Sequence, residues 1–231
     1  MAVVKILLSP KSLKTIMSEL NPILKAVIAA TASFNPITNA IFTGVTTYRG
    51  EIEMRFVKEV IMGVNERINK LEQRIDKEYI KSDDYMNFLY KTLGKAAGDV
   101  RKEKLKMFAN IIVNSALIGR PSIKDGNKYL YDETIDKIDD SLFEFLLRLC
   151  SRGMVYDENR NAGWRGDDED LKQLCVDERT FFFYVDYLLS VGVLVRLPNF
   201  EIDDNGVMSY YAEYFVTQYG YDFVEYVRDQ I

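Results

Sequence analysis

Residues 186–200 read DYLLSVGVLVRLPNF, and here one kind of secondary structure gives way to another. The first part of the stretch belongs to an apolar helical run, and Gly192 follows it as a helix stop signal. A short run with β-branched residues comes next and favours a strand, before the chain reaches Pro198. The stretch therefore predicts a helix that ends near Gly192 and leads directly into a strand.

Further strands and helices are expected on both sides of this join. The two strands cover about residues 193–202 and 207–217, and Asp204-Asn205-Gly206 joins them, because Asn-Gly is the strongest short signal for a type I′ hairpin. Thr217 is placed to cap a closing helix. Upstream, DSLFEFLLRLC, DLKQLC and ERTFFFYVDYLLSVG predict three helices. The order helix, helix, helix, strand, turn, strand, helix is that of a winged-helix domain.

The N-terminal half contains the clearest periodicity in the chain. Apolar residues recur at alternating spacings of three and four, which predicts a long helix over about residues 50–80. The members of this stripe are Met54, Val57, Ile61, Val64, Ile68, Leu71 and Ile75. Ser82 is a suitable N-cap for a second helix over 83–117. We expect the two helices to pack as an antiparallel hairpin, and the alternative is a coiled coil between two copies of the chain.

These patterns predict a mainly α protein of two domains. The first is a helical domain over residues 1–118, which contains short helices and then the long hairpin. A polar stretch over 119–138 carries Gly, Pro and Asp-Gly turn signals and is expected to be a linker. The second is a winged-helix (α+β) domain over 139–231.

Composition excludes many enzyme classes. The 231 residues include no histidine and two cysteines, so the chain lacks the usual near-neutral proton carrier and the ligands of common zinc sites. It also lacks a GxxxxGK[ST] loop and a GxGxxG turn after a predicted strand. We therefore expect a protein without catalytic residues, metal or cofactor. No secretory signal is recognised, which favours the cytoplasm.

Charge is divided unevenly between the two predicted domains. Residues 1–138 hold 22 Lys and Arg against 16 Asp and Glu, a net charge of +6, whereas residues 139–231 hold 8 against 19, a net charge of −11. Arg179 is the single cation on the expected recognition helix, and the hairpin tip is acidic. Such a domain is poorly suited to DNA phosphates. Protein contacts are expected instead, with three aromatic candidates: Phe182, Tyr210 and Tyr211.

Two other groups of residues are candidates for surface contacts. Lys102, Lys104 and Lys106 lie close together on the second long helix and are candidates for an anionic surface, although a solvated helix face explains them more simply. Residues 21–48 contain a single charge, Lys25, and predict two short helices. They form either an internal hairpin or an interfacial segment. In the second case Ile37, Ile41 and Phe42 are the expected membrane or partner contacts.

The C-terminal half resembles a known family. KLKMFANIIVNSAL is followed by IDKIDDSLFEFLLRL, VDYLLSVGVLVRLP and YFVTQYGYDFVEYVR, an arrangement that resembles Abi-alpha-like abortive-infection proteins of bacteria and their mobile elements. The resemblance covers roughly residues 100–231. The positions that match are Leu188, Leu189, Gly192, Leu194, Thr217, Gly220 and Phe223. The resemblance implies a role in phage defence and carries no catalytic residue with it.

We therefore expect a non-enzymatic effector or adaptor of the abortive-infection type. Its expected partner is another protein, and a peripheral position at the inner membrane face is the accompanying expectation. Two alternatives stay open. One is a nucleic-acid-binding winged-helix regulator that uses the basic helical half, although nucleic acid is the less favoured partner. The other is a structural homo-oligomer built on the apolar stripe.

Overall fold

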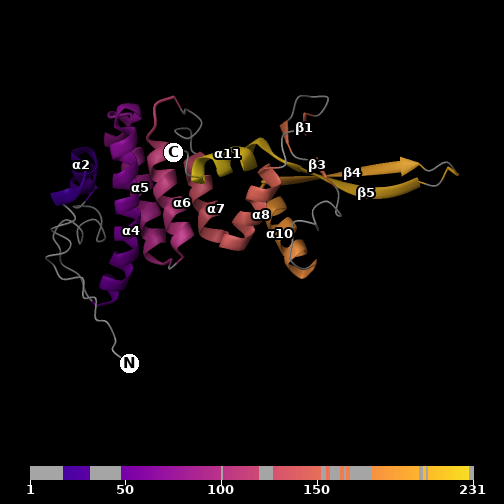
Figure 1. Cartoon of the computed structure of the whole chain (residues 1–231), viewed down its shortest axis with the longest axis horizontal. Helices are drawn as coiled ribbons and strands as arrows, with labels where there is room; N and C mark the ends of the chain where they lie inside the picture. The colour runs from indigo at the N-terminus through magenta and orange to yellow at the C-terminus, as the bar shows by residue number, and fades with distance from the viewer. Residues whose placement is uncertain are drawn as a thin grey trace. The chain divides into compact units, whose positions relative to one another are not determined.

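The structure is a computed structural model and describes residues 18–31, 48–99, 101–119, 127–151, 155–156, 162–163, 165–166, 178–202, 205–206 and 208–228. The described part is mainly helical, as the sequence predicted, and its strands lie in the C-terminal third (Figure 1). The chain divides into two compact units, which we call unit 1 (Met1–Lys137) and unit 2 (Ile138–Ile231).

All of the apolar stripe except Ile75 lies in helix α4 (Tyr48–Leu71), and most of its described side chains are buried inside unit 1. α4 packs against α5 (Asp83–Ala97) and α6 (Lys102–Ser115). The stripe residues buried to 3% exposure or less are Val57, Ile61, Val64, Ile68 and Ile75. Because helices of the same chain cover these residues, the stripe serves the core of unit 1 rather than a seam between two copies.

Helix α4 ends earlier than the expected residue 80. Two short 3-10 turns follow it, η1 (Glu72–Arg74) and η2 (Tyr79–Lys81), and between them Ile75 forms an isolated β-bridge with Leu117. The Asp76 carboxylate accepts two backbone N–H groups of the next turn at 3.2 and 3.0 Å. An Asp side chain that bonds to nearby backbone in this way competes with helical hydrogen bonding.

The second long helix is divided in two. Ser82 caps α5 as predicted, because its Oγ accepts a backbone N–H of the first turn at 3.2 Å. The prediction of one helix over 83–117 is wrong, because α5 ends at Ala97, with Gly98 as its C-cap, and α6 begins after Arg101. In the break, Asp99 Oδ1 accepts the backbone N–H of Arg101 at 2.9 Å. Glycine and a backbone-bonding aspartate both disfavour a helix interior.

Helix α6 forms the centre of unit 1. It packs against α4, α5 and α7 (Lys128–Lys137), and most of its side chains from Lys104 to Ser115 are buried. Its contact with α4 is close at one point, where a Cβ added to Gly63 would lie 3.1 Å from the Cβ of Ala109. Glycine therefore lets these two helices approach closely.

Helix α7 corrects the predicted linker over residues 119–138. It packs on α5 and α6, so unit 1 continues to Lys137 instead of ending at residue 118. Tyr131 and Ile135 are fully buried at 0% exposure. Three polar residues of the same helix are also buried: Lys128, Asp132 and Thr134. The polar composition of this segment indicated a linker because local sequence does not reveal the partners of these side chains on other helices.

Among its described residues, unit 2 contains two of the three helices predicted before the hairpin, the two long strands and the closing helix, together with three short strands that the sequence did not predict. In chain order its elements are α8 (Asp140–Ser151), β1 (Val155–Tyr156), β2 (Ala162–Gly163), β3 (Arg165–Gly166), α10 (Glu178–Ser190), β4 (Leu194–Ile202), β5 (Met208–Val216) and α11 (Gln218–Val227). β4 and β5 pair antiparallel in unbroken register from Leu194↔Val216 to Ile202↔Met208. The short β3 pairs with β5, which gives the sheet order β3-β5-β4. The helix expected at residues 170–175 lies outside the described residues.

The join between α10 and β4 has the geometry that its sequence suggested. Gly192 adopts a φ of +74°, a left-handed conformation that glycine accepts without a steric cost. The N–H of Gly192 donates to Leu189 O at 3.1 Å, and the N–H of Val193 donates to Leu188 O at 2.9 Å. These are the two hydrogen bonds of a Schellman motif, which ends α10 and turns the chain into β4.

Thr217 ties the same join to the start of α11. Its hydroxyl donates to Gly192 O at 2.7 Å and accepts the N–H of Gly220 at 3.2 Å, which confirms the predicted cap. Further along α11, Phe223 is fully buried, and its ring meets that of Phe143 edge to face at 6.4 Å. Thr217 therefore caps this helix, Gly220 lets it approach the sheet, and Phe223 anchors it.

Replacing Gly220 by alanine is expected to destabilise unit 2 by about 1–3 kcal/mol, because overpacking forces the backbone to shift. A Cβ at this position would lie 2.9 Å from Val216 Cγ1 and 3.0 Å from the backbone oxygen of Val193. Gly94→Ala is the matched control, since nothing lies within 4 Å of its added Cβ. Urea unfolding followed by circular dichroism measures both variants. Equal stability of the two would contradict the close approach at Gly220.

Candidate functional site

The outer face of α10 carries the most exposed aromatic side chains of the described residues. Phe183 is 62% exposed and Phe182 is 52% exposed, whereas Val185 and Leu188 on the opposite side are buried at 4% and 0%. Phenylalanine rings are rarely left in water as adjacent pairs without a contact surface to form. Phe182 was a predicted protein contact, and Phe183 is a further candidate that the sequence analysis did not single out.

Charged residues flank this aromatic pair. Arg179 and Asp186 are both exposed on α10, and Arg179 is the helix's single cation in the sequence. A helix that reads DNA places several cations and hydrogen-bonding side chains against phosphates and base edges. Among the described side chains, the surface around Phe182 and Phe183 instead combines large apolar rings with one cation and one anion, which suits a protein partner better.

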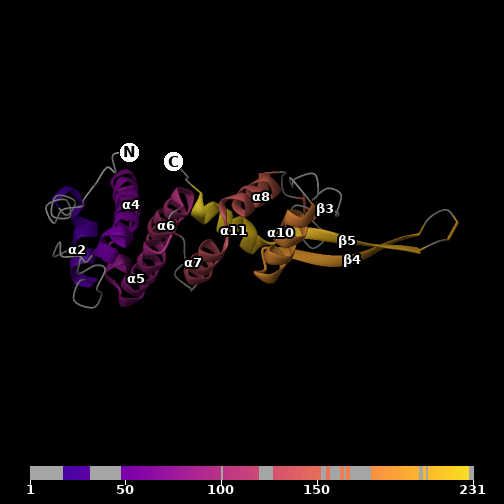
Figure 2. The same ribbon diagram turned by 90° about the horizontal axis from the view of Figure 1, so that it is seen from below.

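The β4–β5 hairpin adds exposed apolar residues to unit 2. Both strands extend beyond α10 and α11 in two perpendicular views (Figure 1, Figure 2). The exposed apolar side chains are Val195 (41%), Leu197 (47%), Ile202 (55%) and Met208 (46%). The predicted contacts Tyr210 and Tyr211 lie in β5, opposite Phe200 and Asn199, and their side chains lie outside the described part.

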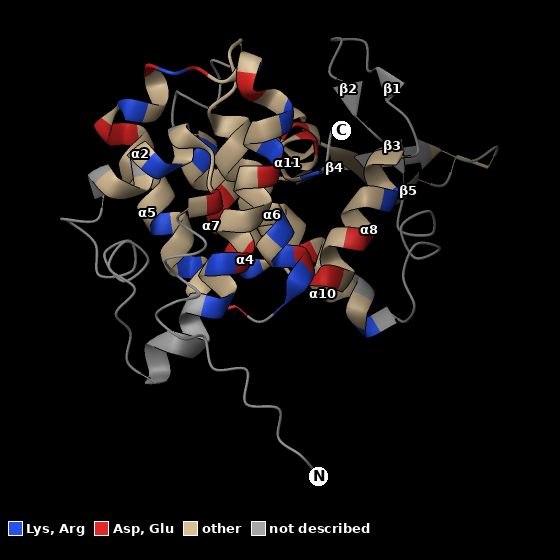
Figure 3. Cartoon of the chain, turned by 60° about the vertical axis from the view of Figure 1, so that its left-hand side comes forward, with Lys and Arg blue, Asp and Glu red and all other residues tan. Residues whose placement is uncertain are grey.

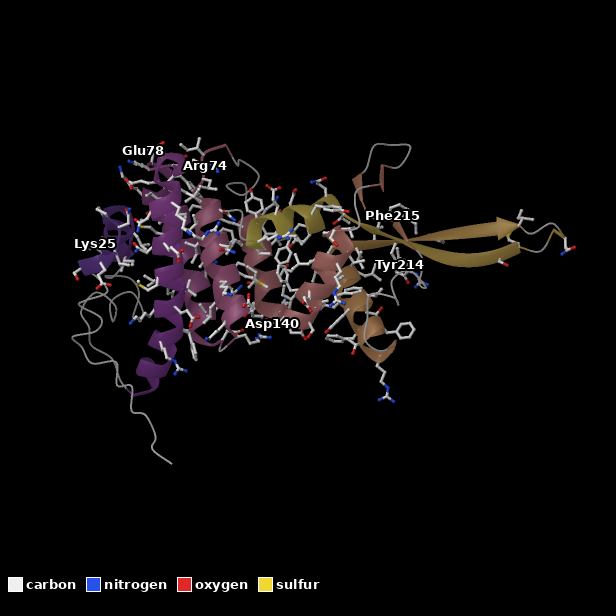
Figure 4. All side chains as sticks on the ribbon, viewed as in Figure 1. Lys25, Arg74, Glu78, Asp140, Tyr214 and Phe215 are labelled. Atoms are coloured by element: carbon white, nitrogen blue, oxygen red, sulfur yellow. The ribbon has the colours of Figure 1, made fainter. Side chains whose placement is uncertain are left out.

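The base of the hairpin is packed, in contrast to its outer part. Tyr214 and Phe215 extend to opposite sides of β5 (Figure 4), as neighbouring residues of a strand do. Tyr214 is 5% exposed, and the guanidinium of its cross-strand partner Arg196 lies 5.9 Å from its ring centroid. The hairpin is therefore anchored at the base while its far end carries the exposed residues.

Two of the three lysines predicted to meet an anionic surface are exposed on α6. Lys102 lies in the first turn, and Lys106 is paired with Glu103 at 2.8 Å within the same helix. Figure 3 marks the charged positions along α5, α6 and α7. A surface pair of this kind screens the lysine that takes part in it. Lys102 and Lys106 remain candidates for such a contact, and Lys106 is already partly neutralised.

The third lysine, Lys104, does not fit the prediction. Its exposure is 0%, its Nζ donates to the backbone oxygen of Asp136 at 2.5 Å, and Asp99 lies 3.4 Å away. Burial lowers the pKa of Lys104, and the neighbouring charge of Arg101 acts in the same direction. A fully buried ammonium cannot reach an external phosphate, so the prediction of a surface contact is wrong for Lys104, which ties α6 to α7.

The ionisation of Asp99 makes the stability of unit 1 depend on pH. Burial alone would raise its pKa, but hydrogen bonds from Arg101 and the charge of Lys104 lower it from the ordinary 3.8 to about 2. Because the folded-state pKa is the lower one, this stabilisation is complete above pH 3.8 and is lost as the pH falls through about 2.

We expect the stability gap between the wild type and Asp99→Asn to be largest near neutral pH and to shrink as the pH falls from 3.8 to about 2. Asparagine has no ionisable group, so its contribution to the free energy of unfolding does not change with pH. Urea unfolding at a series of pH values measures the gap. A gap that stays constant down to about pH 2 would contradict the lowered pKa.

The predicted membrane contacts Ile37, Ile41 and Phe42 lie outside the described residues. The helix before them, α2 (Pro22–Thr31), is described and packs on α5. Its apolar residues Leu24 and Ile28 are buried at 2% and 0%. For this first helix of the 21–48 segment, the interpretation as internal packing holds. In the part of the chain that the structure describes, no helix has the length and hydropathy needed to cross a bilayer.

Lys128 lies at the centre of a polar and aromatic cluster between α5 and α7. Its exposure is 0%, and its Nζ lies 2.6 Å from an Asp84 carboxylate oxygen. The hydroxyls of Tyr79 and Tyr129 donate to the same carboxylate at 2.8 and 3.0 Å. The Nζ also lies 4.7 Å from the ring centroid of Tyr129 and 5.9 Å from that of Phe88, within cation–π range.

The protonation equilibria of this cluster fit a structural role. Burial and the hydrogen bond to Asp84 raise the pKa of Tyr129 to about 12 and also raise the pKa of Tyr79. Burial opposes ionisation of Asp84, but hydrogen bonds from Lys128 and the two tyrosines lower its pKa overall. Each group is thus held in its ordinary charge state by its neighbours. A group poised for proton transfer has a pKa close to the working pH instead.

An open hollow of about 600 Å³ borders the end of α4. Its lining is almost entirely polar or charged: Asn69, Lys70, Leu71, Glu72, Gln73, Arg74 and Lys77. Sites for small molecules are predominantly apolar and enclosed, with a few convergent polar groups. Arg74 and Glu78 lie at this end of unit 1 (Figure 4), where the side chains are well solvated. The hollow therefore has the character of an ordinary hydrated surface.

The described residues thus offer the exposed surface of unit 2 as the candidate site, with Phe182 and Phe183 at its centre. Comparison of the chain with protein-family models, with curated proteins and with solved structures finds no match. Its function is therefore inferred from its own residues and their geometry.

Proposed function

We propose that the protein is a non-enzymatic effector or adaptor of the abortive-infection type that acts by binding another protein. The observation that carries the proposal is the adjacent exposed pair Phe182 and Phe183 on α10, at 52% and 62% exposure. Large aromatic side chains that reach water together are the usual anchors of protein interfaces. The connection to phage defence comes from the resemblance of the C-terminal half to Abi-alpha-like proteins.

The proposal includes a winged-helix fold for unit 2. Three points support it: the chain order α8, β3, α10, β4, β5; the pairing of the early strand β3 with β5; and the helix-to-strand join at Gly192. In a winged helix the first strand of the sheet pairs with the last, as β3 does here. α10 then holds the position of the recognition helix, and the turn between β4 and β5 holds that of the wing. Fold alone assigns no function, so the site decides it.

The alternative of a DNA-reading regulator has less support. In unit 2 the net charge of −11 opposes the approach of phosphates, and α10 presents phenylalanines where a DNA reader needs cations and amides. In unit 1 Lys104 of the basic cluster is buried, and Lys106 is paired with Glu103. Peripheral membrane contact through Ile37, Ile41 and Phe42 is a separate proposal, which does not depend on unit 2.

A phage challenge of bacteria that express the protein tests the proposed function. Phe182→Ser/Phe183→Ser is expected to reduce protection at least about tenfold, because it removes the anchors of the interface. Its stability is expected to change by less than about 0.5 kcal/mol, since both rings are exposed. Tyr90→Ser in unit 1 is the matched control, because Tyr90 is also exposed, at 42%. It is expected to protect like the wild type.

Two further results bear on the alternatives. Lys102→Ala/Lys106→Ala is expected to leave protection unchanged, and a loss there would favour an anionic surface as the site of action. Fluorescence anisotropy with duplex DNA at increasing salt is expected to show no binding by the purified protein. Full protection by the Phe182→Ser/Phe183→Ser variant, at wild-type protein levels, would contradict the proposal.

A further inference from the structure

The negative charge of unit 2 is concentrated in two stretches of the sequence. Residues 167–178 hold six Asp and Glu against one Lys, a net charge of −5, and residues 201–204 hold three Asp and Glu and no cation. Together these two stretches supply −8 of the −11 that residues 139–231 carry. Such a concentration of one sign of charge attracts cationic partners and repels anionic ones over about 8–10 Å at ordinary salt.

The more acidic of the two stretches leads directly into α10. Glu178 is the last residue of this stretch and the first residue of the helix, one turn before Phe182. Asp186 is exposed one turn after Phe182, and Arg179 is the single cation of the helix. The sequence therefore places acidic residues both before and after the exposed aromatic pair along α10.

Helix α8 adds exposed carboxylates to the same unit. The ring centroids of Phe145 on α8 and Tyr184 on α10 lie 5.6 Å apart, so the two helices are in contact. Asp140, at the start of α8 (Figure 4), and Glu144 are exposed, and Glu144 is paired with Arg148 at 3.6 Å. α8 therefore contributes one more exposed carboxylate than exposed cation.

We propose that the partner of the α10 surface is a basic amphipathic segment of another protein. Its apolar side chains pack on Phe182 and Phe183, and its Lys and Arg side chains compensate the acidic charge of unit 2. Complementary charge of this kind speeds association and excludes partners of the wrong sign. This inference rests on the proposed function, because it names the kind of protein that the same surface binds.

Other occupants of the α10 surface are less compatible with the charge of unit 2. Anionic lipids, nucleic acids and unit 2 of a second copy would all bring further negative charge. Residues 1–138 carry a net charge of +6, but several of their lysines are already paired within unit 1: Lys70 with Glu66, Lys81 with Glu78, Lys95 with Glu133 and Lys106 with Glu103. The compensating charge is therefore expected from a different protein.

Binding of a model peptide to the full chain tests the charge of the partner. The probe is a fluorescently labelled helical peptide of about two heptads that contains leucine and lysine, with the leucines on one face. Fluorescence anisotropy should show a Kd of about 1–100 µM at about 50 mM salt and at least about tenfold weaker binding at about 500 mM. The same peptide with glutamate in place of each lysine should not bind.

Two double variants test whether the peptide binds at the α10 surface. Phe182→Ser/Phe183→Ser should weaken binding at least about tenfold, because it removes the apolar anchors. Asp168→Lys/Glu169→Lys should also weaken binding at least about tenfold, because it reverses two charges in the stretch that precedes α10. Circular dichroism checks that both variants keep the helix content of the wild type.

Glu19→Lys/Glu59→Lys is the matched control for the charge reversal. Both residues are exposed in unit 1, and the net charge of the chain changes by the same amount, so this variant should bind like the wild type. An equal loss of binding in the two lysine variants would overturn the proposal, as would binding that is insensitive to Phe182→Ser/Phe183→Ser. A wild-type chain that does not bind the lysine peptide, or that binds the glutamate peptide equally well, would also overturn it.

Photo-crosslinking separates this inference from the proposed function. A photoreactive phenylalanine analogue replaces Phe183 in cells challenged with phage, and the partner segment that carries the adduct is sequenced. A segment with a net positive charge is the expected result. An adduct on an acidic segment would overturn the basic partner and leave the protein-binding role standing, whereas the absence of any protein adduct would contradict both.

Discussion

Asp84→Asn is expected to lower the free energy of unfolding by about 3 kcal/mol, because it leaves the ammonium of Lys128 buried without a counter-charge. Lys128 has 0% exposure, and Asp84, at 2.6 Å, is the carboxylate that compensates it. The pair joins α7 to α5, so its loss weakens the packing of the last helix of unit 1. Urea unfolding followed by circular dichroism measures the change.

Asp83→Asn supplies the matched control for this prediction. Asp83 precedes Asp84 in the first turn of α5 and is exposed, so its substitution should cost less than about 1 kcal/mol through the helix dipole alone. Asp84→Asn combined with Lys128→Met should recover part of the lost stability, since no buried charge remains. Equal unfolding midpoints for Asp83→Asn and Asp84→Asn would show that the ion pair of Lys128 and Asp84 contributes little to stability.

Lys104→Ala is expected to destabilise unit 1 by about 3 kcal/mol, whereas Lys102→Ala and Lys106→Ala should each change stability by less than about 0.5 kcal/mol. The three lysines lie within two turns of α6, but Lys104 alone is fully buried. Its loss removes the ion pair with Asp99 and the hydrogen bond to the Asp136 backbone. Chemical denaturation of the three variants under identical conditions provides the comparison.

The same three variants distinguish a structural lysine from a surface contact. If Lys104 met an external anionic surface, Lys104→Ala would be as stable as Lys102→Ala. It would then differ from the wild type in function. We expect the reverse, a variant with reduced stability and no specific loss of binding. Three alanine variants of equal stability would contradict the burial of Lys104.

The parts of the fold that the sequence predicted correctly depend on local patterns. The apolar stripe of α4 predicted a helix because its period leaves one continuous apolar face. Gly192 and Thr217 marked the ends of their helices because capping needs a particular residue type at a particular place. The same patterns suggested that the run Phe181–Tyr184 has more aromatic residues than one buried face requires. Among the described side chains of this run, Phe182 and Phe183 are exposed and Tyr184 is buried.

The parts that the sequence did not predict depend on contacts between distant residues. The polar sequence of α7 predicts a linker, since it does not reveal that the buried Lys128 and Asp132 have their partners on α5. The sequence around Lys104 predicts a surface position, because a run of charges is normally solvated and the partners of Lys104 on other segments cannot be read from the sequence. β3 has two residues, too few for any alternating pattern. Each of these features is specified by tertiary packing.

Photo-crosslinking in bacterial cells challenged with phage will decide whether α10 binds a protein. A photoreactive phenylalanine analogue at position 183 tests the most exposed of the described aromatic side chains of α10, and the same analogue at position 90 of α5 is the control. We predict a protein adduct of defined mass at position 183 that is missing at position 90. An adduct with DNA at position 183, or no protein adduct there, would contradict a protein-binding role for unit 2.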